Sequence, residues 1–276
     1  MIHHICRKSD DGKTLLYSWT TAMHTRIDLL FCAEQSEECL VKISEEVSNE
    51  INRIEKFGSC FDPASELSKL NATKKSTPIV VSKELFQLLS LCKKYNKDTL
   101  GLFDITVGSE DYNSKTIEGL NFCEDNIISK ENSGIRIDLS GVLKGYALDC
   151  IKDIIKQRGI SNALINMGNS SVLAIGPGIN MKEDKGWNVG FPDLHDRIVL
   201  HDECLTTSGN DSENRRHIIN PHTGKMIEGK RQLAVITDCG TEGEVLSTAL
   251  FIATAEERAM IASNFNIKKI IDISKT

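Results

Sequence analysis

Residues 36–57 restrict the fold of this chain more than any other segment. The apolar residues of this segment recur at three- and four-residue steps: Leu40, Ile43, Val47, Ile51 and Ile54. That spacing puts them on one face of an α-helix, and the residues between them are mostly charged or polar. Residues 15–19 and 25–31, which precede this segment, alternate in the manner of two strands. The sequence therefore predicts an amphipathic helix that lies on a sheet.

The rest of the chain mixes strand-like and helix-like segments without a regular order. Strands are predicted at 78–81, 163–166, 172–175, 187–191, 198–200, 204–207 and 233–237. Helices are predicted after the N-cap residue Ser82, from a small-residue turn near 141 to about Arg158, and over 243–257. Runs of strands outnumber strand–helix–strand units, which indicates a compact α+β fold. Because no linker or low-complexity tract interrupts the chain, we expect residues 1–276 to form a single domain.

The composition is that of an ordinary globular protein, with 40% hydrophobic and 26% charged residues. A net charge of −6 provides no general positive field for nucleic acid or an anionic membrane. Nine cysteines are scattered singly and are expected to be free thiols in a reducing compartment. The first twenty residues lack the apolar run of a signal peptide, and no segment is long and apolar enough to span a bilayer. We therefore expect a cytoplasmic protein, or a periplasmic one if the native chain is longer.

A polar turn at residues 217–224 follows a pair of arginines, Arg215 and Arg216. It contains His217, Asn220 and a proline, and the chain must bend there. Imidazole nitrogens, cationic donors and backbone N–H groups together suit an anionic ligand such as phosphate. An ordinary polar turn would have the same composition, so this stretch alone does not decide between the two.

A second polar turn lies at residues 135–149, where a predicted strand runs through small residues into a helix. The start of a helix exposes unpaired backbone N–H groups that favour phosphate, and Lys144 adds a positive charge. The stretch is neither a Walker A loop nor a G-x-G-x-x-G fingerprint, so nucleotide binding of those kinds is not indicated.

Two pairs of polar residues have a spacing that suits a binding site. Asp104 and Thr106 would point to the same side of an extended segment and line one wall, although a polar strand face has the same pattern. Glu244 and Thr248 share a helix face and could hold one hard cation, although a solvated helix edge is the commoner explanation. On composition alone, Phe61 is expected to be a loop residue that packs into the core.

Taken in order, these segments resemble the ApbE family, the FAD:protein FMN transferases. The similarity runs from about Met23 to about Ala253. The motifs that carry it are Met23-His24-Thr25, residues 65–71, 101–108 and 138–149, Thr207-Ser208-Gly209, residues 217–224 and residues 246–250.

The resemblance implies an α+β fold of two intertwined subdomains, with mixed or antiparallel sheets, packed helices and a flavin cleft between the halves. It also implies a magnesium-dependent transfer of FMN from FAD to a threonine or serine hydroxyl of an acceptor protein, with release of AMP. This reaction needs a metal at the diphosphate, donors for its developing charge and a base for the hydroxyl proton.

The resemblance further assigns site residues. Phe61 would lie near the isoalloxazine ring. His217 would lie at the diphosphate and is the candidate base. Glu244 and Thr248 match the metal-ligand positions, and a backbone carbonyl of residues 141–143 would help them. The other cofactor-binding residues would line the entry and the cleft: Met23, Asp104, Thr106, Asp138, Lys144 and Ser208.

The chain also departs from the family pattern. Glu244 and Asn220 each stand where the family usually has aspartate, and Gly168-Asn169-Ser170 replaces Gly-Gly-Asp. The Pro-Leu and Trp-Gly-Phe continuation after Gly108 is missing. These departures leave two alternatives to transfer, namely an FAD-binding protein of the same fold without transfer activity and an FAD pyrophosphatase that gives FMN and AMP.

Overall fold

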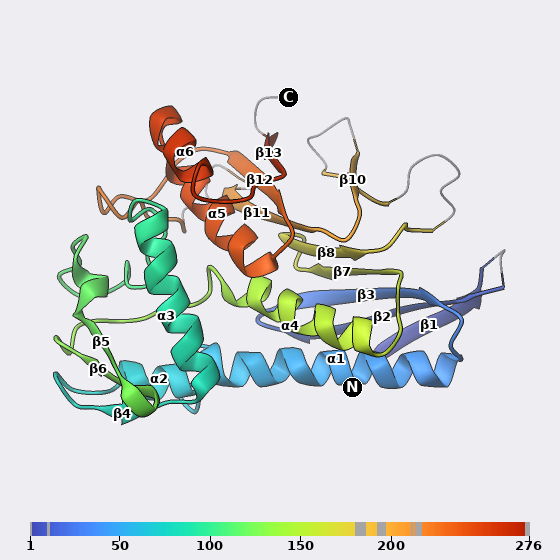
Figure 1. Ribbon diagram of the computed structural model, residues 1–276, viewed down its shortest axis with the longest axis horizontal. Coiled ribbons are helices and arrows are strands. Elements are labelled where there is room, and N and C mark those ends of the chain that lie inside the picture. The colour runs from blue at the N-terminus through green and yellow to red at the C-terminus, as the bar shows by residue number, and fades with distance from the viewer. Residues whose placement is uncertain are drawn as a thin grey trace.

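An eight-stranded antiparallel sheet is the largest element of the fold (Figure 1). The computed structural model describes residues 2–9, 12–179, 186–191, 197–210, 212 and 217–273. In spatial order, the strands of the sheet are β1 (His3–Lys8), β2 (Thr14–Ala22), β3 (Thr25–Ala33), β7 (Ala163–Met167), β8 (Ser171–Ile175), β11 (Cys204–Asn210), β12 (Arg231–Thr237) and β13 (Lys269–Asp272). Neighbouring strands run antiparallel throughout.

Three helices cover one face of this sheet: α1 (Glu37–Gly58), α4 (Leu143–Gln157) and α5 (Gly240–Ile252). α1 contacts β2 and α4, and α5 contacts α4, β11 and β12 (Figure 1). The side chain of Ser36 caps α1, and the apolar stripe of this helix is buried in the main core. The prediction of an amphipathic helix on a sheet is therefore confirmed.

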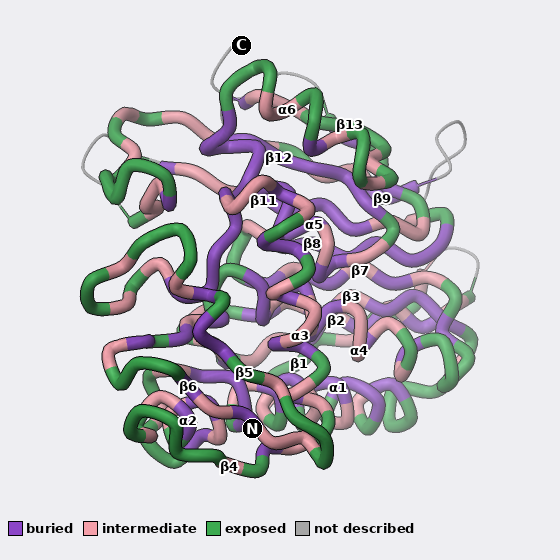
Figure 2. Tube along the Cα trace, turned by 60° about the vertical axis from the view of Figure 1, so that its left-hand side comes forward, coloured by how far each residue is buried: buried purple, intermediate pink, exposed green. Residues whose placement is uncertain are grey.

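The other face of the sheet is covered in its middle by a hairpin of β9 (Trp187–Val189) and β10 (Ile198–Leu200). All five residues of β8 are buried, because Leu173 packs on the helix side while Val172 and Ala174 pack with Trp187 in a second cluster. Strands covered on both faces read as continuous apolar runs. Figure 2 shows the buried parts of the trace gathered in these middle strands and the exposed parts on the loops.

A smaller layer lies at one end of the molecule, on the left of Figure 1. It contains α2 (Glu66–Asn71), α3 (Lys83–Asp98) and a three-stranded sheet of β4 (Ile79–Val80), β6 (Ile127–Lys130) and β5 (Leu120–Cys123), with short 3-10 turns η1 (Thr116–Gly119) and η2 (Glu124–Asn126). The fully buried Lys130 ties this layer together, because its Nζ donates to the carbonyl oxygens of Asn71 at 2.7 Å and Ile135 at 3.0 Å.

The α+β class with antiparallel sheets and packed helices is confirmed, with local corrections. Residues 243–257 are not one helix, because Thr254 caps a separate helix, α6 (Ala255–Ala262), through a capping box with Glu257. Residues 66–71, for which no element is predicted from the sequence, form α2. Residues 135–139 pair with no strand.

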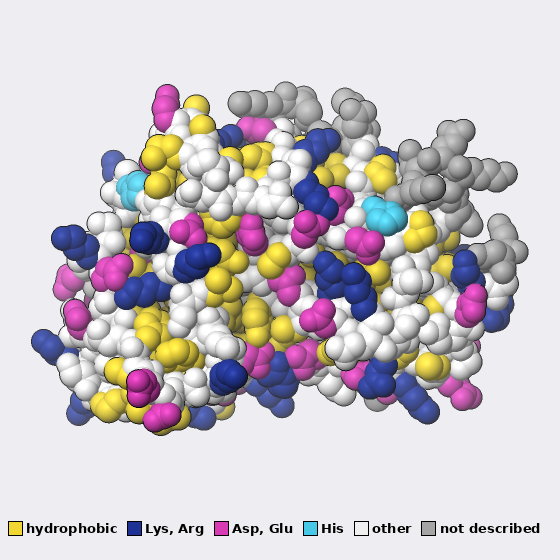
Figure 3. Space-filling model, in the orientation of Figure 1, with side chains coloured by type: hydrophobic (Ala, Val, Ile, Leu, Met, Phe, Trp, Pro, Cys, Tyr) yellow, Lys and Arg dark blue, Asp and Glu magenta, His cyan; other side chains and the backbone are white. Residues whose placement is uncertain are grey.

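The described helices include none that is long and apolar enough to cross a membrane. Acidic and basic side chains are interspersed over the face seen in Figure 3.

α4 and α5 cross in very close contact at two glycines. A Cβ atom on Gly145 would lie 2.1 Å from the carbonyl oxygen of Gly240 and 2.7 Å from Cγ of Glu244. One turn further along α4, Asp149 accepts hydrogen bonds from the backbone N–H groups of Gly240 at 2.7 Å and Thr241 at 2.8 Å. α4 therefore fixes where α5 begins and where its second turn lies.

Gly145→Ala should lower the free energy of unfolding by about 1–3 kcal/mol, because the added methyl group forces the two helices apart. Urea denaturation measures this change. Gly108→Ala is the control, since a Cβ atom there meets nothing within 4 Å. Equal stability of Gly145→Ala and the wild-type protein would contradict the close crossing.

Candidate functional site

A cavity of about 480 Å³ lies where segments from distant parts of the chain meet. Its walls come from residues 102–107, the start of α4, the turn after β7, the end of β11, residues 217–221 and the inner face of α5. Seven residues expected from the sequence line it: Asp104, Asp138, Lys144, Ser208, His217, Glu244 and Thr248. The structure thus brings His217 and Thr248 to one cavity.

The walls differ in character. The segments 102–107 and 218–221 contribute apolar side chains to the cavity, and α4, α5 and β11 contribute polar ones. A ring nitrogen of His222, Nε2, lies 2.8 Å from the carbonyl oxygen of Leu100. This contact holds the polar turn against the chain just before the 102–107 segment.

Lys144 and Glu244 form the charged centre of the cavity. Nζ of Lys144 lies 3.6 Å from Oε1 of Glu244 and donates to Oγ of Ser170 and, at 2.9 Å, to Oγ of Ser171. Ser171 Oγ in turn donates to Oε1 of Glu244. The Glu244 side chain is only 6% exposed, and a carboxylate so far removed from water needs a cation and hydrogen bonds to be tolerated.

Glu244 and Thr248 place two oxygen atoms that could bind a metal ion one turn apart on α5. The hydroxyl of Thr248 lies 3.0 Å from Oγ of Ser208, which also lies 2.9 Å from Oγ of Ser247. The hydrogen bond to the Glu244 carboxylate goes to Oε1, and in the described part of the chain Oε2 has no such partner. A carboxylate and a hydroxyl are the hard ligands that Mg²⁺ takes, so this donor set fits that ion.

Asp104 lines the cavity, but not from an extended segment. Residues 104–107 form a turn, in which Oδ1 of Asp104 accepts from the backbone N–H of Thr106 at 2.7 Å and from its hydroxyl at 2.6 Å. Tyr112 donates to Oδ2 at 2.9 Å. Burial raises the pKa of Asp104, against the lowering effect of these hydrogen bonds. The prediction that both side chains line one wall is right for Asp104 and wrong for Thr106, which is fully buried behind it.

Met23 and Phe61 lie outside this cavity. Phe61 is 62% exposed, so the expectation that it packs into the core is wrong. Its ring meets the ring of His24 edge to face at 5.5 Å, and both line a separate hollow beside α1. Met23 and His24 have positive φ angles of 50° and 56° in the turn between β2 and β3.

Sequence reasoning missed Ser171 and Tyr112. Ser171 acts on Glu244 because β8 pairs with β11, a long-range pairing that local patterns do not reveal. Tyr112 lies in a stretch from which no structure was predicted. Arg215 and Arg216 lie outside the described residues.

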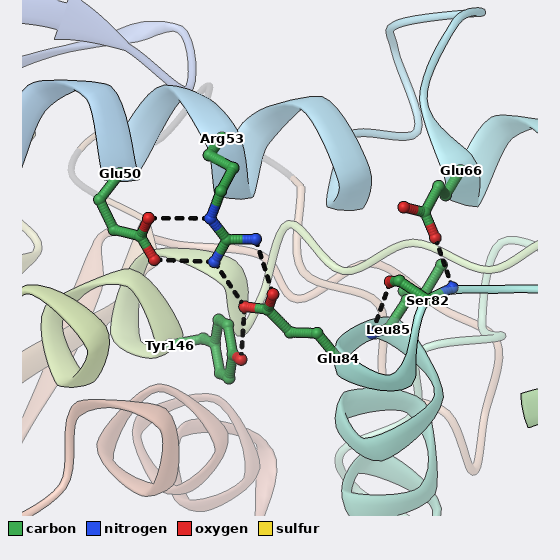
Figure 4. Close-up of polar contacts among 7 residues, drawn as sticks. All are labelled: Glu50, Arg53, Glu66, Ser82, Glu84, Leu85 and Tyr146. Atoms are coloured by element: carbon green, nitrogen blue, oxygen red, sulfur yellow. Dashed lines mark hydrogen bonds and ion pairs between the residues drawn. The ribbon is translucent and has the colours of Figure 1, made fainter.

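Another group of metal-ligating side chains in the described chain comprises Glu50, Glu84 and Cys150, and Figure 4 shows the two glutamates of this group. Arg53 already binds both carboxylates, with contacts of 2.7 Å to Glu50 and 2.6 Å to Glu84, and Tyr146 donates to Glu84 at 2.8 Å. Burial also raises the pKa of the Cys150 thiol to about 11. The guanidinium takes the place that a metal ion would need, and the cluster ties α1, α3 and α4 together.

The fold is that of flavin transferases. The flavin transferase ApbE from Vibrio cholerae superposes with a TM-score of 0.77 at 20% identity, covering 94% of this chain and 93% of that one. The ApbE protein from Thermotoga maritima superposes with a TM-score of 0.76 at 23% identity, covering 91% of each chain.

The sequence profile of the ApbE family matches residues 23–112 and 110–271. The FAD:protein FMN transferase of Vibrio cholerae is 26% identical over 273 residues, which cover 85% of this chain and 78% of that protein. The protein of the same name from Buchnera aphidicola is 23% identical over 303 residues, covering 95% and 87%. The chain belongs to the ApbE family, as the motifs of its sequence indicated.

Replacing Asp104 with Asn should change how stability depends on pH. Because the pKa of Asp104 is raised in the folded protein, the protonated form of this carboxyl group favours the folded state at low pH. This contribution to stability is lost as the pH rises through the folded-state pKa. We expect the wild-type protein to lose stability relative to Asp104→Asn as the pH rises from below 3.8, the ordinary value.

Thermal denaturation of both proteins over a series of pH values measures this effect. Asp153→Asn, which removes an exposed carboxyl group from α4, is the control. A difference in Tm between wild type and Asp104→Asn that stays constant with pH would show that the burial of Asp104 does not raise its pKa.

Proposed function

We propose that this chain transfers FMN from FAD to a threonine or serine hydroxyl of an acceptor protein, with Mg²⁺ bound and with release of AMP. One observation carries the proposal: His217, Lys144, Glu244 and Thr248 line a single cavity. The matched relatives, which are named FAD:protein FMN transferase, support the same activity.

The walls suit a dinucleotide. The first turn of α4 has no side-chain cap, and Gly141 and Lys144 from this region line the cavity. Unpaired N–H groups at a helix start and an ammonium group are the donors that a diphosphate needs. Apolar residues at 102–107 and 218–221 provide a surface for a flat ring. Phe61 would contact the flavin ring only beyond this cavity, in the hollow beside α1, and Met23 would contact it from the turn that also holds His24.

Glu244 and Thr248 would hold Mg²⁺, with help from a backbone carbonyl of the 141–143 turn. When bound, the ion would neutralise oxygens of the diphosphate and so favour its cleavage. Lys144 would bind the same anion, since its ammonium group lies within 3.6 Å of Glu244.

His217 would act as the base. It would take the proton of the acceptor hydroxyl while the hydroxyl oxygen forms a bond to the phosphorus of the FMN half. The bond from this phosphorus to the bridging oxygen breaks, and AMP leaves with that oxygen. Ser208, held by Thr248 and Ser247, would orient the diphosphate.

FAD hydrolysis to FMN and AMP is a second candidate, because His217 is exposed and water can replace the acceptor hydroxyl. FAD binding without transfer is a third, because the Glu244 carboxylate is already paired with Lys144 and Ser171. We also propose that residues 1–276 form one domain and that the protein is cytoplasmic, which its nine free cysteines support.

Incubation of the protein with FAD, Mg²⁺ and a candidate acceptor protein separates these functions. Flavin fluorescence that stays with the denatured acceptor indicates transfer. Free AMP without labelled protein indicates hydrolysis, and FAD binding with neither product indicates a binding protein. If the purified protein binds no FAD at micromolar concentration, with or without Mg²⁺, all three functions are wrong.

Thr248→Ala should lower magnesium-dependent turnover about 10- to 100-fold, because it removes one oxygen ligand from the cavity. The melting temperature without metal should change little, since one hydrogen bond contributes about 1 kcal/mol. Ser247→Ala is the matched control: Ser247 also bonds Ser208 but does not line the cavity. Equal loss of turnover in both variants would argue against Thr248 as a metal ligand.

His217→Ala should reduce transfer by a factor on the order of 100 or more while FAD affinity changes far less, as expected for a general base. Single-turnover rates and equilibrium binding of FAD measure the two effects. If both fall by the same factor, His217 is a binding residue instead.

A further inference from the structure

Two neighbouring threonines on β11 have buried hydroxyl groups without a partner. In the described part of the chain, three buried side-chain polar atoms lack a hydrogen bond: Thr206 Oγ1, Thr207 Oγ1 and Asn210 Oδ1. Buried polar atoms in folded proteins are nearly always hydrogen-bonded, so each exception needs an explanation.

The two threonines face opposite sides of the sheet. Thr206 faces α5, because a Cβ atom on Gly243 of that helix would lie 2.8 Å from its hydroxyl oxygen. Ser208, two residues on, also faces α5 and bonds Thr248. Thr207 lies between them and points to the other face, because successive side chains of a strand alternate. Only Thr207 lines the cavity, where it keeps 8% exposure, whereas Thr206 is fully buried.

The sheet has a notch beside Thr207. β11 pairs with β8 only from Cys204 to Thr206, although it pairs with β12 as far as Asn210. The backbone N–H of Thr207 makes a last bond to the carbonyl oxygen of Ser170 at 2.7 Å. Beyond it the edge of β11 borders the cavity.

Gly209 follows Thr207 and Ser208 along β11 and packs against the backbone of β12. It has a φ of 144°, and a Cβ atom there would lie 2.3 Å from the carbonyl oxygen of Arg231. No side chain therefore fits at this position. Gly209 and Gln232, which face each other across β11 and β12, both line the cavity.

We propose that the Thr207 hydroxyl binds an oxygen atom of the dinucleotide in this cavity. The inference rests on the proposed function and adds a residue to its binding site. Because Thr207 Oγ1 is buried without a partner, this contact requires a rotation about the Cα–Cβ bond that moves the hydroxyl to another staggered position. Ser170, which accepts the Thr207 N–H, also accepts from Lys144 through its side chain. Thr207 therefore borders the positive end of the cavity, where a phosphate, ribose or ribityl oxygen would lie.

Thr207→Val tests the proposal, because valine keeps the shape of threonine and loses the hydroxyl. We expect FAD to bind about 3- to 10-fold more weakly, which corresponds to one neutral hydrogen bond. The melting temperature of the free protein should stay the same or rise, because an unpartnered buried hydroxyl is removed. Titration of flavin fluorescence and thermal denaturation give the two readings.

Thr206→Val is the matched control, since it removes an equally buried and unpartnered hydroxyl from the next residue. It should leave FAD affinity unchanged. Wild-type affinity in Thr207→Val, or equal losses in both variants, would overturn the proposal while leaving the proposed function intact. If the wild-type protein binds no FAD, the proposed function itself fails.

A second pair of variants covers the case in which Thr207→Val does not fold. Thr207→Ser keeps the hydroxyl and should bind FAD like the wild type, whereas Thr207→Ala should bind it about 3- to 10-fold more weakly. Equal affinities of these two variants would overturn the proposal.

Titrations of Thr207→Val with FMN and with ADP distinguish the possible oxygen atoms. Weaker binding of FMN alone assigns the hydroxyl contact to the ribityl side of the dinucleotide, and weaker binding of ADP alone assigns it to the ribose side. Weaker binding of both ligands assigns the contact to a phosphate. No loss with either ligand or with FAD contradicts the contact.

Discussion

The crossing of α4 and α5 determines the geometry of the cavity. Gly145 and Gly240 let the two backbones touch, and Asp149 fastens the first N–H groups of α5 to α4. A larger residue at either position would move the second turn of α5, which carries Glu244. Because the Lys144 ammonium group comes from the residue before Gly145, the same contact sets the spacing between the two charges. The cavity chemistry thus depends on a contact that involves no reacting group.

Lys144 and Glu244 share their hydrogen-bond partners within the cavity. Ser170 and Glu244 are two positions at which the resemblance leads us to expect a departure from the family pattern. Lys144 donates to the hydroxyl groups of Ser170 and Ser171, and its ammonium group lies 3.6 Å from the Glu244 carboxylate. The same carboxylate accepts from Ser171, so the acid on α5 supplies the negative charge beside Lys144.

Local sequence patterns predicted the elements well and the contacts between them only in part. The stripe on α1 and the cap at Ser82 were predicted from local features, and the structure has both. The Thr254-x-x-Glu257 capping box was also readable and would have separated α5 from α6. In contrast, the shielding of Thr106 behind Asp104 depends on how a turn folds back, which residue spacing does not encode.

The order of the strands in the sheet also affects how the protein folds during synthesis. β3 pairs with β7, which begins at Ala163, and β11 inserts between β8 and β12. Joining strands so far apart costs chain entropy before any contact repays it, which makes such topologies slow to fold. α5 carries two groups of the cavity and follows every strand of the sheet except β13. A chain still emerging from the ribosome therefore has the sheet face that α5 covers exposed, and it acquires a complete binding site only after residues 240–252 have been synthesised.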